Sequence, residues 1–199
     1  LDEHQAKMVL AAYGVPVTRE GLAATAEEAA AIAAGIGFPV AAKACAWEIM
    51  HKSGRGLIAL NIPTEDALRA AFRSIRAAAG RAVPVLVQEM VAGAREFVAG
   101  MTRFPGFGPC VIFGLGGVFT EALNDTTLRS APLSATEAEE MVRDIRARAL
   151  LGEFRGLPGV DLDALGGILR AVGAVACLHP EIAEIDLNPL IIAGSKPVV

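Results

Sequence analysis

The segment 184–190 constrains the fold more than any other stretch, because polar and apolar side chains alternate along its sequence EIDLNPL. In an extended strand alternate side chains share a face, so Glu184, Asp186 and Asn188 are expected to project together while the isoleucine and leucines help to fill a core. Three oxygen-bearing side chains on a mostly apolar strand are costly to bury unless something satisfies them. A hard divalent cation such as Mg²⁺ would do so. An edge strand with one solvated face is the alternative.

Charge and hydropathy narrow the class of protein. The 199 residues carry a formal net charge of −4 and contain no run of Lys or Arg, which argues against duplex nucleic-acid binding as the main activity. The longest charge-free stretches, residues 29–42 and 104–120, are too short for a membrane span and contain Gly and Pro. Residues 1–9 lack the basic start and apolar run of a signal peptide. We therefore expect neither a membrane nor a nucleic acid as partner.

The cysteines indicate a reducing compartment. Cys45, Cys110 and Cys177 are odd in number, widely spaced and set in apolar surroundings. They are expected to be small buried side chains rather than a disulfide framework or a zinc site. Together with the absence of a visible signal peptide, this predicts a cytoplasmic protein.

Helical and strand patterns alternate along the chain without a linker. Two capping boxes, Thr25–Glu28 and Ser134–Glu137, mark helix starts. The expected helices span residues 2–13, 25–35, 64–79, 134–151 and 161–178. The expected strands span residues 38–44, 57–62, 83–91, 95–102, 109–113, 182–191 and 195–199. Because several strands are joined by short turns, we expect an α+β arrangement rather than a doubly wound sheet.

A lysine and the loop after it suggest an anion site. Lys43 lies inside an apolar strand, where it either snorkels to an edge or faces an anion. The loop His51–Gly56 then combines cations, a hydroxyl and two glycines. Backbone amides on such a turn suit a phosphate group. A basic β-turn without a ligand would look similar.

Two further features have a structural and a functional interpretation. Glu96 opens an apolar strand, where its carboxylate would accept hydrogen bonds from the hydroxyls of a sugar or simply be solvated. The glycine-rich turn Gly114–Gly117 follows an apolar strand, but no helix follows it directly. It therefore lacks the context of a Rossmann fingerprint.

Several short motifs occur in a fixed order: Lys43, His51-Lys52-Ser53, Val87-Gln88-Glu89-Met90, Glu96, Phe107-Gly108-Pro109, Phe113–Gly117, Leu151-Gly152 with Arg155-Gly156, and residues 184–190. Together they resemble the ATP-grasp domain of NDP-forming acyl-CoA synthetases, the group that includes the ADP-forming acetyl-CoA synthetase β subunit. The succinyl-CoA synthetase β subunit is a more distant relative. The resemblance covers nearly the whole chain, from Glu3 to Leu190.

The resemblance implies an ATP-grasp fold, in which two α+β subdomains clasp a nucleotide. The smaller subdomain is expected to span residues 22–91, and the larger one residues 1–21 and 92–199. Both are expected to be cut from a longer multidomain protein. The implied cofactors are ATP or ADP and Mg²⁺. The implied partners are CoA-binding and ligase domains of the same protein or of a partner subunit, and we expect the full-length protein to be an oligomer.

The resemblance also implies roles for individual residues. Lys43 would contact nucleotide phosphate, and His51 matches a histidine implicated in phosphoryl relay, so both are candidate catalytic residues. Glu96 would hold the ribose, and Asp186 and Asn188 would hold Mg²⁺. A loop would close over the phosphates, and a hinge would meet adenine largely through backbone groups. The implied cofactor-binding set is Lys43, Ser53, Gly54, Gly56, Gln88, Glu89, Met90, Val91 and Glu96.

The implied function is phosphoryl transfer between ATP and a histidine on the way to acyl phosphate and acyl-CoA. This is an acid–CoA ligase activity for which an isolated domain would be incomplete. The family often has an acidic residue and two adjacent glycines where this chain has Gly54-Arg55-Gly56-Leu57. That departure keeps a second class open: a non-catalytic nucleotide-sensing or scaffolding ATP-grasp-like domain, for example one fused to a protein acetyltransferase.

Overall fold

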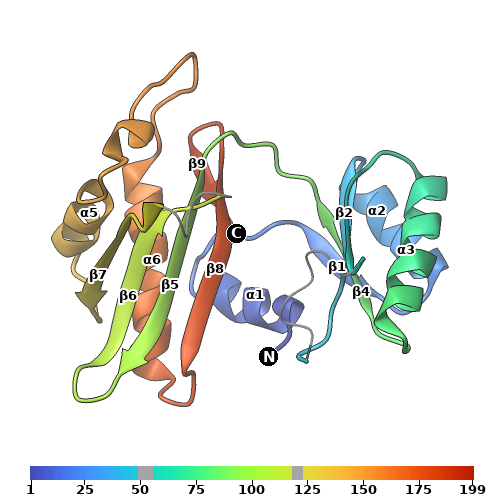
Figure 1. The fold of residues 1–199 in the computed structure, drawn as a ribbon, viewed down its shortest axis with the longest axis horizontal. Coiled ribbons are helices and arrows are strands. Elements are labelled where there is room, and N and C mark those ends of the chain that lie inside the picture. Colours follow the sequence, from blue (N-terminus) through green and yellow to red (C-terminus); the bar gives the residue numbers. More distant parts are fainter. Residues whose placement is uncertain (49–55, 118–122) are drawn as a thin grey trace. The chain divides into compact units, whose positions relative to one another are not determined.

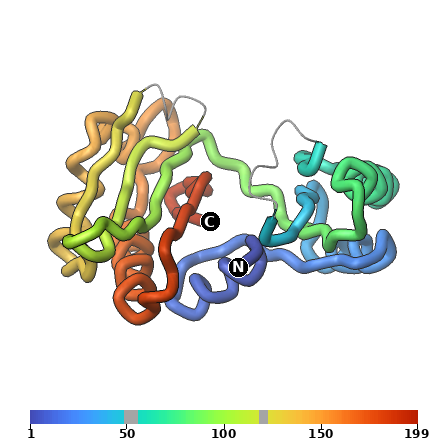
Figure 2. The backbone as a smooth tube through the Cα atoms, turned by 60° about the horizontal axis from the view of Figure 1, so that its bottom comes forward, coloured from blue at the N-terminus to red at the C-terminus, as the bar shows by residue number. Residues whose placement is uncertain are grey.

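Two antiparallel sheets, each with helices on one face, organise the chain (Figure 1). The structure is a computed structural model that describes residues 1–48, 56–117 and 123–199. It divides into a first unit, Leu1–Val9 with Thr18–Val91, and a second unit, Leu10–Val17 with Ala92–Val199. Figure 2 traces the backbone through both units. The predicted α+β class is confirmed, because helices and antiparallel sheets are mixed along the chain.

The first unit is a four-stranded sheet covered by two helices. Its strand order is β1 (Glu20–Ala23), β4 (Val85–Glu89), β2 (Val40–Ala44) and β3 (Ile58–Ile62). The covering helices are α2 (Ala26–Ile36) and α3 (Glu65–Ala79), and the chain begins with α1 (Glu3–Ala12). Buried residues of α2 and α3 form one core with the facing side chains of the sheet.

Helix α3 shows how the sequence specifies this core. Thr64 caps its N-terminus by accepting from the Ala67 N–H, and the next turn brings the first buried side chain. Leu68, Phe72 and Ile75 recur at intervals of four and three residues and are buried against the sheet. Truncating a buried phenylalanine of this kind to alanine typically costs about 3–5 kcal/mol.

The second unit is a five-stranded sheet. Its strand order is β7 (Thr126–Ser130), β6 (Gly108–Leu115), β5 (Glu96–Phe104), β8 (Glu184–Ala193) and β9 (Lys196–Val198). Its helices are α5 (Ala135–Arg143), the 3₁₀ turn η1 (Arg148–Leu151) and α6 (Leu162–Leu178). Helix α6 packs against β5 and β6. Beneath it, the Phe97 and Phe113 rings stack with centroids 5.4 Å apart.

The sequence missed two strands and overextended one helix. Strands β1 and β7 lie at sheet edges, where short or polar sequences such as EGLA and TTLRS give little periodic signal. The helix expected to reach residue 151 ends at Arg143, and the chain continues through turns into η1. The expectation for Cys177 was wrong, because this side chain is exposed near the end of α6, whereas Cys45 and Cys110 are buried.

The boundary between the units differs from the expected division. Residues 1–9 and 18–21 were expected to join residues 92–199, but they belong to the first unit. The reason is that β1 pairs with β4, and the start of α1 is tied to the same sheet by ion pairs. No helix within the described ranges combines the length and the apolar character needed to cross a bilayer.

Candidate functional site

The predicted site residues of the described ranges lie on strands or directly beside them. Lys43 is on β2, Gln88 and Glu89 end β4, Met90 and Val91 follow it, Glu96 opens β5, and Asp186 and Asn188 are on β8. Gly56 begins the second described range. His51, Ser53 and Gly54 lie outside the described residues.

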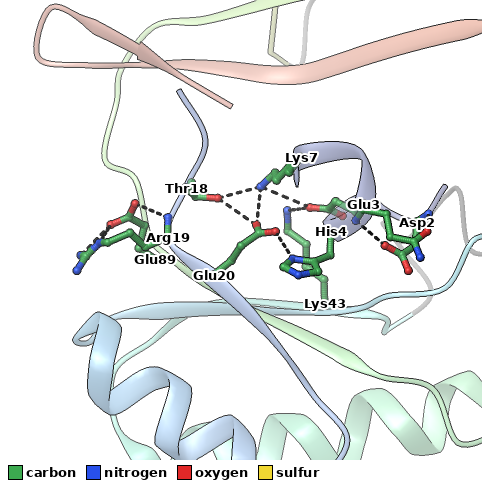
Figure 3. A network of polar contacts seen from close by, with 10 residues as sticks. Asp2, Glu3, His4, Lys7, Thr18, Arg19, Glu20, Lys43 and Glu89 are labelled. Atoms are coloured by element: carbon green, nitrogen blue, oxygen red, sulfur yellow. Dashed lines mark hydrogen bonds and ion pairs between the residues drawn. The ribbon is translucent and has the colours of Figure 1, made fainter. Parts of the chain in front are cut away.

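Lys43 meets an anionic group instead of snorkelling into solvent. Ala42 and Ala44 belong to the core under α2 and α3, so Lys43 between them projects from the opposite face of the sheet. Its side chain is only 18 % exposed, and its Nζ donates to Glu3 Oε1 at 2.8 Å (Figure 3). Of the two interpretations of this lysine, the structure therefore supports the one in which it faces an anion.

A second lysine extends this ion pair into a network (Figure 3). The Lys7 ammonium is buried and donates to Thr18 Oγ1 at 2.9 Å and to Glu20 Oε2 at 3.0 Å. It also lies 3.9 Å from Glu3 Oε1, and His4 Nδ1 lies 2.8 Å from Glu20 Oε1. Sequence reasoning did not include these residues, although the i,i+4 spacing of Glu3 and Lys7 was a signal for the pair. The network fixes the start of α1 against the sheet face that carries Lys43.

The predicted hinge is anchored through Glu89. Its carboxylate accepts from the Arg19 backbone N–H and from Arg19 Nε, both at 2.8 Å. Its own N–H donates to the Arg19 carbonyl at 3.0 Å. The Glu89 side chain is thus engaged by the segment before β1, and the next backbone N–H, that of Met90, donates to the Pro39 carbonyl at 3.4 Å.

Glu96 sits where the glycine-rich turn meets the start of β5. The Gly116 N–H donates to the Glu96 carbonyl at 2.9 Å. A Cβ atom at Gly116 would lie 2.7 Å from the Phe97 carbonyl carbon, so no larger residue fits there without a shift. The glycine-rich turn, which lacks a Rossmann context, thus packs closely against the backbone of Glu96 and Phe97 and fixes the backbone at the start of β5.

Strand β8 displays the polar face that the sequence predicted. Glu184, Asp186 and Asn188 are exposed, whereas Leu187 and Leu190 are buried in the second unit's core. Strict alternation would place Leu190 on the same face as the three polar residues. A bulge prevents this, as the pairing with β5 shows.

The bulge lies at the asparagine. Leu187 pairs with Ala99 and Leu190 with Phe97, so Asn188 and the following proline both face the single residue between those partners. Bulges of this kind bend a strand, re-aim its side chains and are frequent beside functional sites. Here the bulge exposes Asn188 while it returns Leu190 to the core.

The surroundings of Asp186 fit a bound cation. Although the residue as a whole is exposed, partial burial of its carboxyl group, and then the charge of Glu184, raise the pKa of Asp186 above its usual range. Gly100 lies opposite on β5, where a Cβ atom would come within 2.3 Å of the Ile185 carbonyl oxygen, so only glycine allows the two strands to approach this closely. A divalent cation would relieve the unfavourable charge of Asp186, and Asn188 would supply a second oxygen.

These two residues fit Mg²⁺ better than a cation that needs a full protein cage. Within the described ranges no group of three His, Cys, Asp or Glu side chains could enclose a metal. Magnesium keeps several waters and is commonly bound through one or two protein oxygens together with substrate phosphates. Asp186 and Asn188 on β8 provide two protein oxygen donors of this kind.

A buried arginine next to Glu96 was not anticipated. The Arg95 side chain is 5 % exposed and donates to four backbone carbonyls, those of Leu150, Gly152, Pro158 and Gly194, at 2.7–3.2 Å. It thereby ties the segment after η1 and the β8–β9 turn to the first residues of β5. Only its position directly before Glu96 marked it in the sequence.

Comparisons with known proteins agree with this architecture. The family model described as "ATP-grasp domain" matches residues 1–199. The β subunit of acetate–CoA ligase [ADP-forming] I from Pyrococcus furiosus is 41 % identical over 196 residues, which cover 96 % of this chain and 84 % of that subunit. Acetate–CoA ligase [ADP-forming] I from Archaeoglobus fulgidus is 41 % identical over 187 residues, which cover 92 % of this chain but only 27 % of that protein.

A solved structure gives the same result. The dinucleotide-forming acetyl-coenzyme A synthetase 1 of Candidatus Korarchaeum cryptofilum, in complex with coenzyme A and Ca-AMPCP, superposes with a TM-score of 0.95 at 40 % identity. The match covers 100 % of this chain and 90 % of that one. The chain therefore belongs to the ATP-grasp family and, within it, to the group of ADP-forming acetyl-CoA synthetase β subunits and domains.

Proposed function

We propose that this chain is the ATP-grasp nucleotide-binding part of an NDP-forming acyl-CoA synthetase. It passes the γ-phosphoryl group of ATP to a histidine, on the way to an acyl phosphate and an acyl-CoA. The Archaeoglobus relative, of which the chain spans 27 %, is a much longer ligase. The CoA-binding and ligase steps accordingly belong to other domains of the same protein or to a partner subunit. The named relatives are ligases, which favours this function over the sensing alternative.

The observation that carries the proposal is the environment of Lys43. An ammonium group largely shielded from solvent, on an otherwise apolar strand, is held within 2.8 Å of a carboxylate. The ammonium group is therefore already arranged to meet an anion. A nucleotide phosphate carries more negative charge than a carboxylate. When it binds, it takes the place of the Glu3 carboxylate beside the Lys43 ammonium group. Phosphoryl transfer depends mainly on such charge neutralisation and positioning.

The remaining residues bind the rest of the nucleotide. Glu96, fixed by the glycine-rich turn, accepts hydrogen bonds from the ribose hydroxyls. The backbone of Met90 and Val91 meets the base. Asp186 and Asn188 would hold Mg²⁺, which would supply positive charge to the phosphate groups. Each of these contacts positions the ligand and leaves the transfer itself to the histidine.

The phosphoryl acceptor is His51. A neutral imidazole near pH 7 is a competent nucleophile. Its ring nitrogen forms a bond to the γ-phosphorus while the bond between that phosphorus and the β,γ-bridging oxygen breaks. ADP leaves with the electron pair. The phosphoryl group is then available to a second acceptor on the CoA-binding part.

The test uses ATP labelled in its γ-phosphate. The full chain, incubated with this ATP and Mg²⁺, is expected to gain acid-labile, base-stable label, as a phosphohistidine does. His51→Ala should remove the label. His179→Ala is the matched control, because His179 packs against Tyr13 with a 2.8 Å contact between Tyr13 Oη and His179 Nε2 and has no role in the proposal.

Two results would argue against the proposal. Label that survives His51→Ala would remove this histidine from the transfer. A chain that binds neither ATP nor ADP would overturn the assignment as a nucleotide-binding domain.

A further inference from the structure

A short hairpin between η1 and α6 has an arginine at a backbone position that disfavours it. The Phe154 N–H donates to the Leu157 carbonyl at 3.1 Å, and the Leu157 N–H donates back to the Phe154 carbonyl at 2.9 Å. The two residues between them, Arg155 and Gly156, have φ angles of 48° and 82°. Two successive positive φ angles are typical of a type I′ turn, which prefers asparagine, aspartate or glycine at its first position. An arginine there is strained, and such strain indicates a function for the side chain.

The base of this hairpin is anchored on both sides of the turn. The buried Arg95 guanidinium donates to three backbone carbonyls that flank it, those of Leu150, Gly152 and Pro158. The Val160 N–H also donates to the Leu151 carbonyl at 2.8 Å. In Figure 1 the hairpin is the orange loop that projects beyond the sheet of the second unit. The fold therefore holds the tip of the hairpin out from the core.

The tip presents an aromatic ring and a guanidinium group to solvent. Phe154 is 44 % exposed, and the Arg155 guanidinium carbon lies 5.3 Å from the centroid of its ring. Within residues 1–48, 56–117 and 123–199, no carboxylate forms an ion pair with Arg155. Aromatic residues and arginine are enriched at the centres of protein interfaces. An exposed ring beside an arginine without a carboxylate partner therefore suits the binding of another protein surface.

The chemistry of the tip indicates an acidic partner. A guanidinium group buried in an interface needs acceptors for its N–H groups, and a carboxylate meets two of them at once. A second copy of this chain docked through the same surface is disfavoured, because two-fold pairing would bring two Arg155 side chains together. The Archaeoglobus relative extends far beyond the 27 % of its length that matches this chain, so such a ligase has other parts that the hairpin can contact.

We infer that the hairpin 151–160 docks the ATP-grasp part onto another part of the ligase. Arg155 binds an aspartate or glutamate of that part, and Phe154 packs against the apolar side chains around it. The inference rests on the proposed function, which assigns the CoA-binding and ligase steps to other domains or to a partner subunit. The contact keeps the ATP-grasp part beside the next acceptor of its phosphoryl group. Weakening it slows the overall reaction and leaves ATP binding by this chain unchanged.

The first test identifies the partner by cross-linking. The complete ligase carrying Phe154→p-benzoylphenylalanine is irradiated, and the linked peptides are identified by mass spectrometry. The expected link is to the CoA-binding or ligase part, beside an aspartate or glutamate. Phe107→p-benzoylphenylalanine is the matched control, because Phe107 is an exposed phenylalanine in the turn between β5 and β6 and should not link to the same peptide. Links confined to this chain, or to a segment without an acidic residue, would overturn the inference.

The second test removes the guanidinium group and keeps the turn. Arg155→Asn introduces a residue that a type I′ turn prefers, so the Tm should stay the same or rise. Acyl-CoA formation by the complete ligase should nevertheless fall by about tenfold or more, and the loss should shrink at high salt. Arg155→Lys keeps the charge without the bidentate geometry and should lie between the two. Arg170→Gln removes an exposed arginine of α6 and should leave the rate unchanged.

The outcomes distinguish this inference from the proposed function. Full acyl-CoA formation by Arg155→Asn would refute the docking role while leaving the nucleotide site standing. A lower Tm for Arg155→Asn would also refute it, because the arginine would then stabilise the turn itself. Wild-type chain that binds neither ATP nor ADP would instead overturn the proposed function.

Discussion

Replacing Glu3 by glutamine should tighten nucleotide binding. Glu3 Oε1 accepts from Lys43 Nζ at 2.8 Å, which places a negative charge beside the ammonium group that we assign to phosphate. An incoming phosphate must share or take over that ammonium and is repelled by the carboxylate. The isosteric amide of Glu3→Gln keeps a hydrogen-bond acceptor next to Lys43 and removes the charge.

The magnitude follows from Coulomb's law. A phosphate oxygen in contact with Lys43 on the side opposite Glu3 lies about 5.6 Å from the carboxylate, twice the 2.8 Å separation of the present ion pair. The repulsion of two unit charges at that distance is about 0.7 kcal/mol in water and about 3 kcal/mol at an effective dielectric constant of 20. Because 1.36 kcal/mol is a factor of ten, the variant should bind ADP about 3- to 150-fold more tightly than wild type.

The assay is calorimetric titration of the chain with ADP at low ionic strength, repeated at high salt. Asp2→Asn is the matched control, because it makes the same charge change at the start of α1, where the Asp2 carboxylate accepts from the Gln5 N–H at 2.8 Å. The gain in Glu3→Gln should exceed that of Asp2→Asn and should shrink with salt. Weaker binding by Glu3→Gln would refute the reasoning and make Glu3 an essential support for Lys43.

Two further predictions concern carboxylates of the second unit. The folded-state pKa of Asp186 is raised by burial and by Glu184, so any stability it contributes is present below its unfolded value and lost as pH rises; at pH 7 the ionised group opposes folding. Asp186→Asn should therefore increase the metal-free free energy of unfolding by less than about 1 kcal/mol and raise the metal-free Tm slightly. In thermal melts it should also abolish the stabilisation by Mg²⁺ with nucleotide. A lower metal-free Tm would contradict this. Burial alone would raise the pKa of Asp125, but the N–H groups of Arg146 and Ala147 lower it below its usual range, so its stabilisation is present above the unfolded value and lost as pH falls. Asp125→Ala should cost about 2–3 kcal/mol in denaturant unfolding at pH 7 and less near pH 3, and an equal loss at both pH values would disprove the ionic origin.

The elements with strong periodicity were predictable from the sequence, whereas the edge strands β1 and β7 were not. Helix α3 has both a cap and a 4–3 spacing of apolar residues, and its observed bounds match the prediction. Strand β8 was predicted with its polar face because alternation is a local property. The bulge at Asn188 was not predicted, since it depends on which residues of β5 face it.

The candidate site was predictable only as a set of residue types. An isolated lysine in an apolar strand left two interpretations open, snorkelling to an edge or facing an anion, and Lys43 does face an anion. The identity of that anion was not accessible, because Glu3 is 40 residues away in sequence and is brought to Lys43 by tertiary structure. The same holds for Arg95, whose four carbonyl acceptors come from three separate segments.

A crystal structure of the chain with Mg²⁺ and a non-hydrolysable ATP analogue tests the central claim most directly. The account predicts a phosphate oxygen within about 2.7–2.9 Å of Lys43 Nζ, the usual range for a charge-assisted hydrogen bond. It also predicts that the Glu3 carboxylate shares or releases that ammonium group. A bound nucleotide whose phosphates touch no atom of Lys43 would contradict the account.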